Sequence, residues 1–445
     1  MVLLLEICVA LSCNAQHPVT GRWEGEADCR GAKLHILLDV SAEANGLRAT
    51  VGAPDDFVSD ILVTTIRYAA PNIHLEKQAG DRLIVFDGTL SGNAMTGTMS
   101  AGEITAAIRL VRVGDVPSAP YQQQEVQFQN GDQVLHGTLF ASSKEQRPAI
   151  VVIHSSHQPD RQDLRPIANL FARQGIATLI YDKRDLGADQ TQPHRYSLRD
   201  LAGDALAAVQ FLKSRAEINP SQIGILGISE GGWVAPIAAS QSKDIAFVIT
   251  ISAPVTSWAE TNLYANETSL RAGGFSAEEL REALAALRSE DAYVRNHDSD
   301  AEALQLLLDH SQQQRWASAT NLDVRVPSAA DISSWVRWRD LDLDPTKYWE
   351  RVTAPVLAIY GDLDDRTPVK TSVARLEHAL KQAGNKDVKI AVFPGAGHEI
   401  TLPAGQRPDT KGKWDWPRLA PGYLQTLMDW TLKRAVVPPV SRDKK

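Results

Sequence analysis

Cysteine is scarce in this 445-residue sequence, which contains three. Cys8 and Cys13 lie in an apolar N-terminal segment with features of a secretory signal peptide, whose removal would leave Cys29 alone in the mature chain. A single cysteine forms neither an intramolecular disulfide nor a cysteine metal site. Cysteine usage therefore excludes a disulfide framework, and it does not indicate a cellular compartment.

An excess of positive charge is also absent. Lysine and arginine together number 46 and the acidic residues 54, which gives a formal net charge of −8 at pH 7. Proteins that bind nucleic acid need a basic surface to displace counterions from phosphates. Runs of like charge are missing too, apart from the short basic tail in residues 441–445. We therefore expect no nucleic-acid partner.

Long apolar runs are missing as well. The apolar stretch within residues 1–15 is too short to cross a bilayer, and it ends in small residues, Cys13 to Ala15, that a signal peptidase accepts. We predict a cleaved signal peptide over residues 1–15 and a periplasmic or secreted protein without stable membrane insertion. The alternatives are a frayed or buried N-terminal segment on a cytoplasmic protein, or lipidation of Cys13.

The first part of the chain has the pattern of a small β domain. Residues 16–115 contain short alternating runs, such as "DILVTTIRYA" at 60–69, separated by Gly, Asn and Asp. This pattern predicts seven or eight antiparallel strands in a barrel or sandwich. An accessory role is favoured, with lipid or carbohydrate binding as the alternative. Two prolines mark residues 116–122 as a linker.

After the linker, continuous apolar strands alternate with helical patterns, which indicates a largely parallel sheet covered on both faces. Residues 258–350 interrupt this alternation with amphipathic helical segments. Insertions of this kind lie over the carboxyl ends of strands, so we interpret this one as a helical cap. The expected core is 123–257 with 351–435, followed by a tail at 436–445.

The stretch "IGILGISEGGW" places Ser229 between Gly227 and Gly231, after a buried strand and before a helix. The Gly-x-Ser-x-Gly pattern alone occurs by chance, but a strained strand-to-helix turn exposes a serine nucleophile and aims the following amide at the oxyanion. A serine nucleophile needs a base, and the base needs an orienting acid. Candidates follow the next strands, in the cluster "GDLDD" and at His398.

Residues 123–435 resemble α/β-hydrolases, in particular esterases of the dienelactone-hydrolase and prolyl-oligopeptidase-like branch. The motifs that carry the resemblance are "VVIHSSH", "LIYDKRDLGAD", "DALAAVQFLKS", "GILGISEGGWVAP", "YGDLDDRTP" and "GAGHEI". The resemblance implies an α/β-hydrolase fold with a mostly parallel eight-stranded sheet and helices on both faces. Family spacing assigns the acid to Asp364, with Asp362 and Asp365 as alternatives.

The resemblance also implies an oxyanion hole. One amide is expected from Glu230 and the second from Ser155 or Ser156, in a loop where relatives usually have His-Gly. Read alone, His154 and His157 form a weak candidate metal pair, because no acidic or cysteine ligand is close in sequence. We therefore expect neither a metal nor a cofactor.

Other residues are candidates for shaping the pocket. Asp182 and Arg184 are expected to form a structural pair, with substrate contact as the alternative. Aromatic residues of the cap are candidate substrate-binding residues for an apolar acyl group, although core packing is the alternative for each. These are Trp316, Trp335, Trp338, Tyr348 and Trp349.

Together these features predict a serine hydrolase that cleaves small acyl esters through an acyl-enzyme. Three alternatives remain: a prolyl-oligopeptidase-like peptidase, a thioesterase or acyltransferase with the same triad, and a non-catalytic binding protein on this scaffold. The β domain is too small for the propeller that such peptidases normally carry, and all three triad members are present in the sequence.

Overall fold

We describe the chain from a computed structural model. The structure describes residues 17–435 except 30–31, 57, 80–81, 103, 142–145, 157–159, 185, 187–195, 297–299 and 404–417. The expected signal peptide and the expected tail lie outside the described residues. The chain divides into two compact units, residues 1–55 with 61–118, and residues 56–60 with 119–445.

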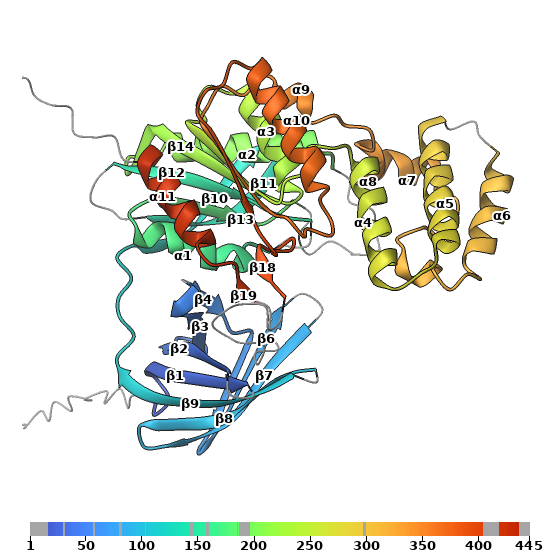
Figure 1. The fold of residues 1–445 in the computed structure, drawn as a ribbon. Coiled ribbons are helices and arrows are strands. Elements are labelled where there is room, and N and C mark those ends of the chain that lie inside the picture. Colours follow the sequence, from blue (N-terminus) through green and yellow to red (C-terminus); the bar gives the residue numbers. More distant parts are fainter. Residues whose placement is uncertain are drawn as a thin grey trace, which may run out of the picture. The chain divides into compact units, whose positions relative to one another are not determined.

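The first unit contains one nine-stranded sheet, in the order β4-β3-β2-β1-β9-β8-β7-β6-β5 (Figure 1). Buried Ala106, Ile108 and Leu110 alternate with exposed neighbours in β9, which is the expected period of two. The run at 60–69 divides into two short strands, β4 and β5, at Val63 and Thr64. The strands are β1 Gly21–Cys29, β2 Ala32–Glu43, β3 Gly46–Ala53, β4 Val58–Leu62, β5 Thr65–Ala69, β6 Asn72–Ala79, β7 Arg82–Ser91, β8 Ala94–Ala101 and β9 Ile104–Gly114.

The second unit is built on an eight-stranded mixed sheet, in the order β10-β11-β13-β12-β14-β15-β16-β17. The hairpin of β10 and β11 turns at Gly131 and Asp132, and β11 runs antiparallel to β13. The other five pairings are parallel. The strands are β10 Gln122–Asn130, β11 Gln133–Ala141, β12 Arg147–Ile153, β13 Ala177–Tyr181, β14 Ile218–Ile228, β15 Phe247–Ile251, β16 Val356–Gly361 and β17 Val388–Phe393, with a small separate pair β18 Thr401–Leu402 and β19 Arg418–Leu419.

Helices cover both faces of this sheet because its central strands are apolar on both sides. In β12, Val151 and Ile153 belong to one apolar core, and Ile150 and Val152 belong to the other. The first core is closed by α2 Leu198–Lys213, α3 Gly231–Gln241 and α10 Val369–Gln382, and the second by α1 Arg165–Arg173 and α11 Tyr423–Ala435. Figure 1 shows α1 and α11 on the same face.

The insertion between β15 and β16 is helical, as the sequence pattern predicts. Helices α4, α5 and α6 pack around their own apolar core and stand together in Figure 1. The final helix, α9, instead joins the core of the main sheet through Trp349. The helices are α4 Trp258–Ala272, α5 Ala277–Asn296, α6 Ala301–Ser311, α7 Ala329–Ser334, α8 Val336–Arg339 and α9 Thr346–Trp349.

No helix among the described residues has the length and apolar character needed to cross a membrane.

Candidate active site

Ser229 lies on a tight turn between the end of β14 and the start of α3. Its φ is +52°, which is unusual for a residue with a side chain, and its amide donates to the Ile251 carbonyl at 2.8 Å. A Cβ on Gly227 would lie 2.1 Å from the Gly231 carbonyl oxygen, so no side chain fits at that position. The glycines therefore permit a turn that holds Ser229 in a strained conformation.

His398 connects Ser229 to a carboxylate. Its Nε2 lies 2.9 Å from Ser229 Oγ, and its Nδ1 lies 2.9 Å from both carboxylate oxygens of Asp364. The Asp364 side chain is fully buried and that of His398 is 8% exposed. The structure thus brings the three predicted catalytic side chains into one hydrogen-bonded chain, each in a segment that follows a strand of the same sheet.

The three candidate aspartates occupy different environments. Asp364 Oδ1 also accepts from the amides of Arg366 and Thr367, both at 2.8 Å, which fixes the carboxylate toward His398. Asp362 is exposed and accepts from the Gly395 amide at 2.6 Å, so it joins two loops. Asp365 is exposed. Geometry therefore selects Asp364 among the three as the partner of His398.

Ser252, which the sequence analysis missed, ties the acid and base loops together. It follows β15 with φ of +52°, and its hydroxyl donates to the His398 carbonyl at 2.6 Å. Its own carbonyl accepts from the Thr367 hydroxyl at 3.1 Å. A hydroxyl directly after a buried apolar strand is the sequence signal that would have indicated it.

Helix α4 of the insertion also contacts the acid loop. The Tyr264 hydroxyl donates to the backbone carbonyl of Asp364 at 2.8 Å. Beside it, Arg375 of α10 donates to the carboxylate of Glu260 at 2.7 and 2.8 Å. The insertion is therefore attached to the core next to the Asp364 loop.

The candidate oxyanion segments lie against each other. The Glu230 amide has no hydrogen-bond acceptor among the described residues, and a Cβ on Gly231 would lie 2.8 Å from the His154 carbonyl oxygen. The exit of β12 is thus packed on the start of α3. Ser155 is partly exposed and Ser156 is exposed.

His154 is a buried histidine with a backbone partner. It is 3% exposed, and its ring donates to the Tyr181 carbonyl. Burial, together with the nearby Lys183 charge, lowers the pKa of His154 to about 3. His157 lies outside the described residues, and the described part of the chain contains no cluster of three potential metal ligands.

The loop after β13 holds three charged residues with separate partners. Asp182 pairs with Arg161, and Arg184 pairs with Asp204 of α2 at 2.7 Å. The expected pair between Asp182 and Arg184 is wrong because their side chains reach different elements, and a structural role for both stays a prediction. Between them, Lys183 pairs with the Glu230 side chain. The carboxylate of Glu230, in an otherwise apolar turn, is the signal for this missed partner.

The candidate substrate-binding tryptophans occupy packing positions in the insertion. Trp316 is 2% exposed inside the α4–α6 core, and Trp338 is 8% exposed in a second small core against which Trp335 packs. Of the other two, Trp349 is buried in the main core and Tyr348 packs against it. Substrate binding by these residues stays a prediction, and their packing favours the core alternative.

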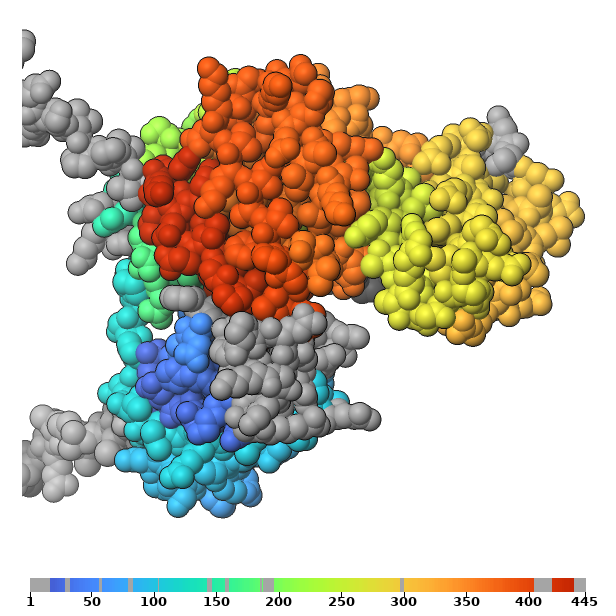
Figure 2. Space-filling model, viewed as in Figure 1, coloured from blue at the N-terminus to red at the C-terminus, as the bar shows by residue number. Residues whose placement is uncertain are grey.

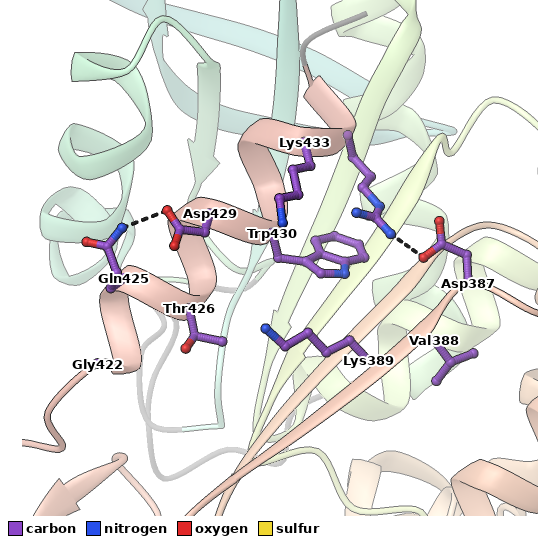
Figure 3. Close-up of a pocket in the computed structure, with 10 residues that line it drawn as sticks. Asp387, Val388, Lys389, Gly422, Gln425, Thr426, Asp429, Trp430 and Lys433 are labelled. Carbon is purple, nitrogen blue, oxygen red and sulfur yellow. Dashed lines mark hydrogen bonds and ion pairs between the residues drawn. The ribbon is translucent and has the colours of Figure 1, made fainter.

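A cavity of about 500 Å³ lies elsewhere, between the edge strand β17 and α11. Figure 3 shows the Trp430 ring between the side chains of Lys433 and Lys389. Arg434 lies 4.7 Å from the same ring and pairs with Asp387. None of the predicted catalytic residues lines this cavity.

Comparison with known proteins relates the segment around this site to a known family. The family model "BAAT / Acyl-CoA thioester hydrolase C terminal" matches residues 206–405, which include Ser229, Asp364 and His398. The quorum-quenching protein AidA of Acinetobacter baumannii is 26% identical over 284 residues, which cover 60% of this chain and 86% of AidA. The segment that contains the three side chains is therefore similar to this acyl-CoA thioester hydrolase family. The superfamily that the sequence motifs indicate is thereby confirmed.

Other relatives of this chain match shorter segments. The polyketide transferase claH of Penicillium crustosum is 34% identical over 146 residues, which cover 32% of this chain and 47% of claH. The crystal structure of the α/β-hydrolase GrgF from Penicillium sp. sh18 is 20% identical, with a TM-score of 0.44 over 71% of this chain and 99% of GrgF.

Proposed function

We propose that the protein is a serine hydrolase that cleaves carboxylic esters through an acyl-enzyme. The observation that carries this proposal is the hydrogen-bonded chain from Ser229 through His398 to Asp364. A serine on a strained turn, a histidine within 2.9 Å and a buried carboxylate on the far ring nitrogen form the arrangement that activates a hydroxyl.

The residues have distinct roles in the proposed reaction. Ser229 Oγ attacks the ester carbonyl while His398 Nε2 takes its proton, and Asp364 holds the ring in the required tautomer. His398 then returns the proton to the leaving alcohol as the carbon–oxygen bond breaks. Water then attacks the acyl-serine while His398 takes its proton, and His398 returns this proton to Ser229 Oγ as the acyl–oxygen bond breaks and the acid is released. The Glu230 amide and a Ser155 or Ser156 amide stabilise both tetrahedral oxyanions.

A thioesterase or acyltransferase is the second candidate. It is supported by the description of the matched family model as an acyl-CoA thioester hydrolase. The chemistry differs only in the leaving thiolate or in the acceptor that resolves the acyl-enzyme. A prolyl-oligopeptidase-like activity has less support, because the described part of the first unit is a single sheet rather than a propeller.

The deciding experiment compares wild type with Ser229→Ala on p-nitrophenyl esters from acetate to laurate. We expect turnover by wild type and background rates for the variant, with the optimal chain length giving the size of the acyl site. Equal rates in both proteins would reject Ser229 as the nucleophile. If wild type hydrolyses no ester, labelling of Ser229 by a fluorophosphonate distinguishes a selective hydrolase from an inactive scaffold.

Wild type and Ser229→Ala also distinguish the esterase from the thioesterase or acyltransferase. Butyryl-CoA and p-nitrophenyl butyrate are compared by kcat/KM, with added alcohol or amine acceptors and product analysis. A preference for the ester with only butyrate formed supports the esterase. A preference for the thioester, or transfer of the butyryl group to an acceptor, supports the thioesterase or acyltransferase.

We also propose that the enzyme acts outside the cytoplasm. The support is the apolar segment ending at Ala15 in the sequence. Expression of the full chain in a bacterium is expected to give a periplasmic or secreted protein whose mass corresponds to a start at Gln16. A cytoplasmic protein that retains residues 1–15 would contradict this proposal.

A further inference from the structure

The side chain next to the nucleophile carries a buried charge. Glu230 follows Ser229, and its side chain is 3% exposed. Its carboxylate pairs with the ammonium group of Lys183, which is 4% exposed. Charges removed from water are costly unless they are paired with good geometry, so this ion pair fixes the position of both residues. The backbone amide proposed to bind the oxyanion therefore belongs to a residue held by its own side chain.

Lys183 also contacts the other proposed oxyanion segment. Its ammonium group donates to the Ser155 carbonyl at 3.4 Å. The Ser155 carbonyl is the acceptor half of the peptide bond whose amide belongs to Ser156. A contact at this carbonyl therefore orients that peptide plane, including the Ser156 N–H. One ammonium group thus touches both segments that would supply oxyanion amides.

The remaining neighbours of Lys183 leave this arrangement intact. Its ammonium group lies 5.6 Å from the centre of the Tyr196 ring, at a distance that suits a cation–π contact. His154 donates to the Tyr181 carbonyl and lies near enough to Lys183 for its charge to help lower the pKa of the imidazole. Glu230 is consequently the described carboxylate that pairs with Lys183.

We propose that Lys183 is a positioning residue that holds the two oxyanion amides at their working separation, by pairing with the Glu230 side chain and the Ser155 carbonyl. The inference rests on the proposed function, since it assigns a role in stabilising the oxyanion of that reaction. It adds a residue that the triad and the turn motif do not include, and it favours Ser156 over Ser155 as the second amide.

The test compares Lys183→Met with a matched control in the same loop, Arg184→Met. Arg184 also forms an ion pair, with Asp204, and its guanidinium donates to the Asp200 carbonyl, so these contacts are with α2. Both variants lose a structural ion pair, so both are expected to have a lower Tm. The reference variant Ser229→Ala gives the background rate.

We expect Lys183→Met to lower kcat for p-nitrophenyl butyrate about 10- to 100-fold with KM changed less than about threefold. The reason is that the loss of one oxyanion donor typically lowers kcat by about 100- to 1000-fold, and displacement of donors has a smaller effect. The inhibition constant of a trifluoromethyl ketone, whose hemiketal oxygen occupies the oxyanion hole, should rise in parallel. Arg184→Met should retain kcat within about threefold when both are assayed well below their Tm.

Each outcome decides the proposal. A folded Lys183→Met protein with wild-type kcat and inhibitor affinity would overturn it, as would equal kcat losses in Lys183→Met and Arg184→Met. If Lys183→Met does not fold, the charge-neutral double variant K183M/E230Q replaces it, and the same two criteria apply. Failure of wild type to exceed Ser229→Ala, together with no fluorophosphonate labelling of Ser229, would instead reject the proposed function, which separates the two failures.

Discussion

At the scale of single residues, neighbouring aspartates in the sequence have different environments in the fold. Asp362, Asp364 and Asp365 lie within four positions of one another, yet only Asp364 of the three is buried and faces His398. Two backbone amides hold its carboxylate, while the Asp362 carboxylate holds the Gly395 amide instead. Local spacing alone does not reveal which of the three carboxylates contacts the histidine.

Replacement of these aspartates should separate their roles. We expect Asp364→Asn to lower kcat for p-nitrophenyl butyrate by about 1000- to 10,000-fold, because the ring of His398 would lose its orienting carboxylate. Asp362→Asn should retain kcat within a few-fold and lower the free energy of unfolding by about 1 kcal/mol through a weaker loop contact. Kinetics and thermal melting of the two variants check this, and similar kcat losses would contradict the assignment of the acid.

At this scale the sequence indicated the three side chains that the structure brings together, because each follows an apolar strand in a recognisable motif. It could not predict the partners of Asp182, Arg184 and Glu230, which depend on side chains 20 to 47 positions away. A charged residue in an apolar run signals that a partner exists, but its identity follows from the fold. The tryptophans of the insertion show the same limit, because helical spacing does not distinguish packing from ligand binding.

At the scale of elements, the strand and helix pattern of the second unit followed from the sequence because its strands are apolar on both faces. The sequence pattern also indicated the polar hairpin of β10 and β11 and the helical insertion. It did not indicate how the insertion is attached to the core, because the attachment depends on single contacts such as the hydrogen bond from Tyr264 to the Asp364 carbonyl. These contacts give testable consequences for the insertion.

Removal of the Tyr264 hydroxyl should affect the acid loop more than the stability of the insertion. A neutral hydrogen bond contributes about 1 kcal/mol, which corresponds to about a fivefold change in an equilibrium or rate. We expect Tyr264→Phe to lower kcat about three- to tenfold with a small change in Tm. Tyr293→Phe, at another partly buried tyrosine of the insertion, is the control, and an equal effect in both would contradict a specific role for α4.

A buried carboxylate gives the insertion a pH-dependent stability. Burial, with the nearby negative charge of Asp323, raises the pKa of Glu290 in α5 to about 8. The unfolded chain therefore loses this proton near pH 4.5 while the folded chain retains it, so stability falls as pH rises from about 4.5 to about 8. Asp291, whose pKa burial raises to about 6, adds to the decline at the acidic end of this range.

Glu290→Gln should remove most of this dependence. We expect the Tm of wild type to fall more between pH 5 and pH 8 than the Tm of the variant. Glu282→Gln, at an exposed position of the same helix, should behave as wild type. Parallel pH profiles for wild type and Glu290→Gln would show that Glu290 does not retain its proton in the folded chain.

At the scale of the whole molecule, the chain has two units, and each unit has its own sheet and its own buried apolar residues. The first unit is an antiparallel sheet without a predicted catalytic residue. The second unit contains all three predicted catalytic residues, Ser229, Asp364 and His398. The predicted domain boundary rests on the change from alternating to continuous apolar strands in the sequence. Units with their own cores commonly unfold as separate cooperative transitions.

Calorimetry of the full chain should accordingly show two unfolding transitions. A trifluoromethyl ketone that binds at Ser229 stabilises the folded state of the unit to which it binds, by an amount that grows with its concentration. We expect one transition to move to higher temperature and the other to stay in place. A single transition that moves as a whole would contradict independent unfolding.

The hydroxyl of Tyr264 also bears on how such enzymes diversify. An insertion that leaves the sheet after one strand and returns before the next can be exchanged for another without altering the strands themselves. Here the departing helix carries a donor for the backbone of the acid loop. A graft from a relative would therefore need an equivalent donor at that position of its first helix, and designed chimeras that keep residues 258–264 from this chain should retain activity more often than those that replace them.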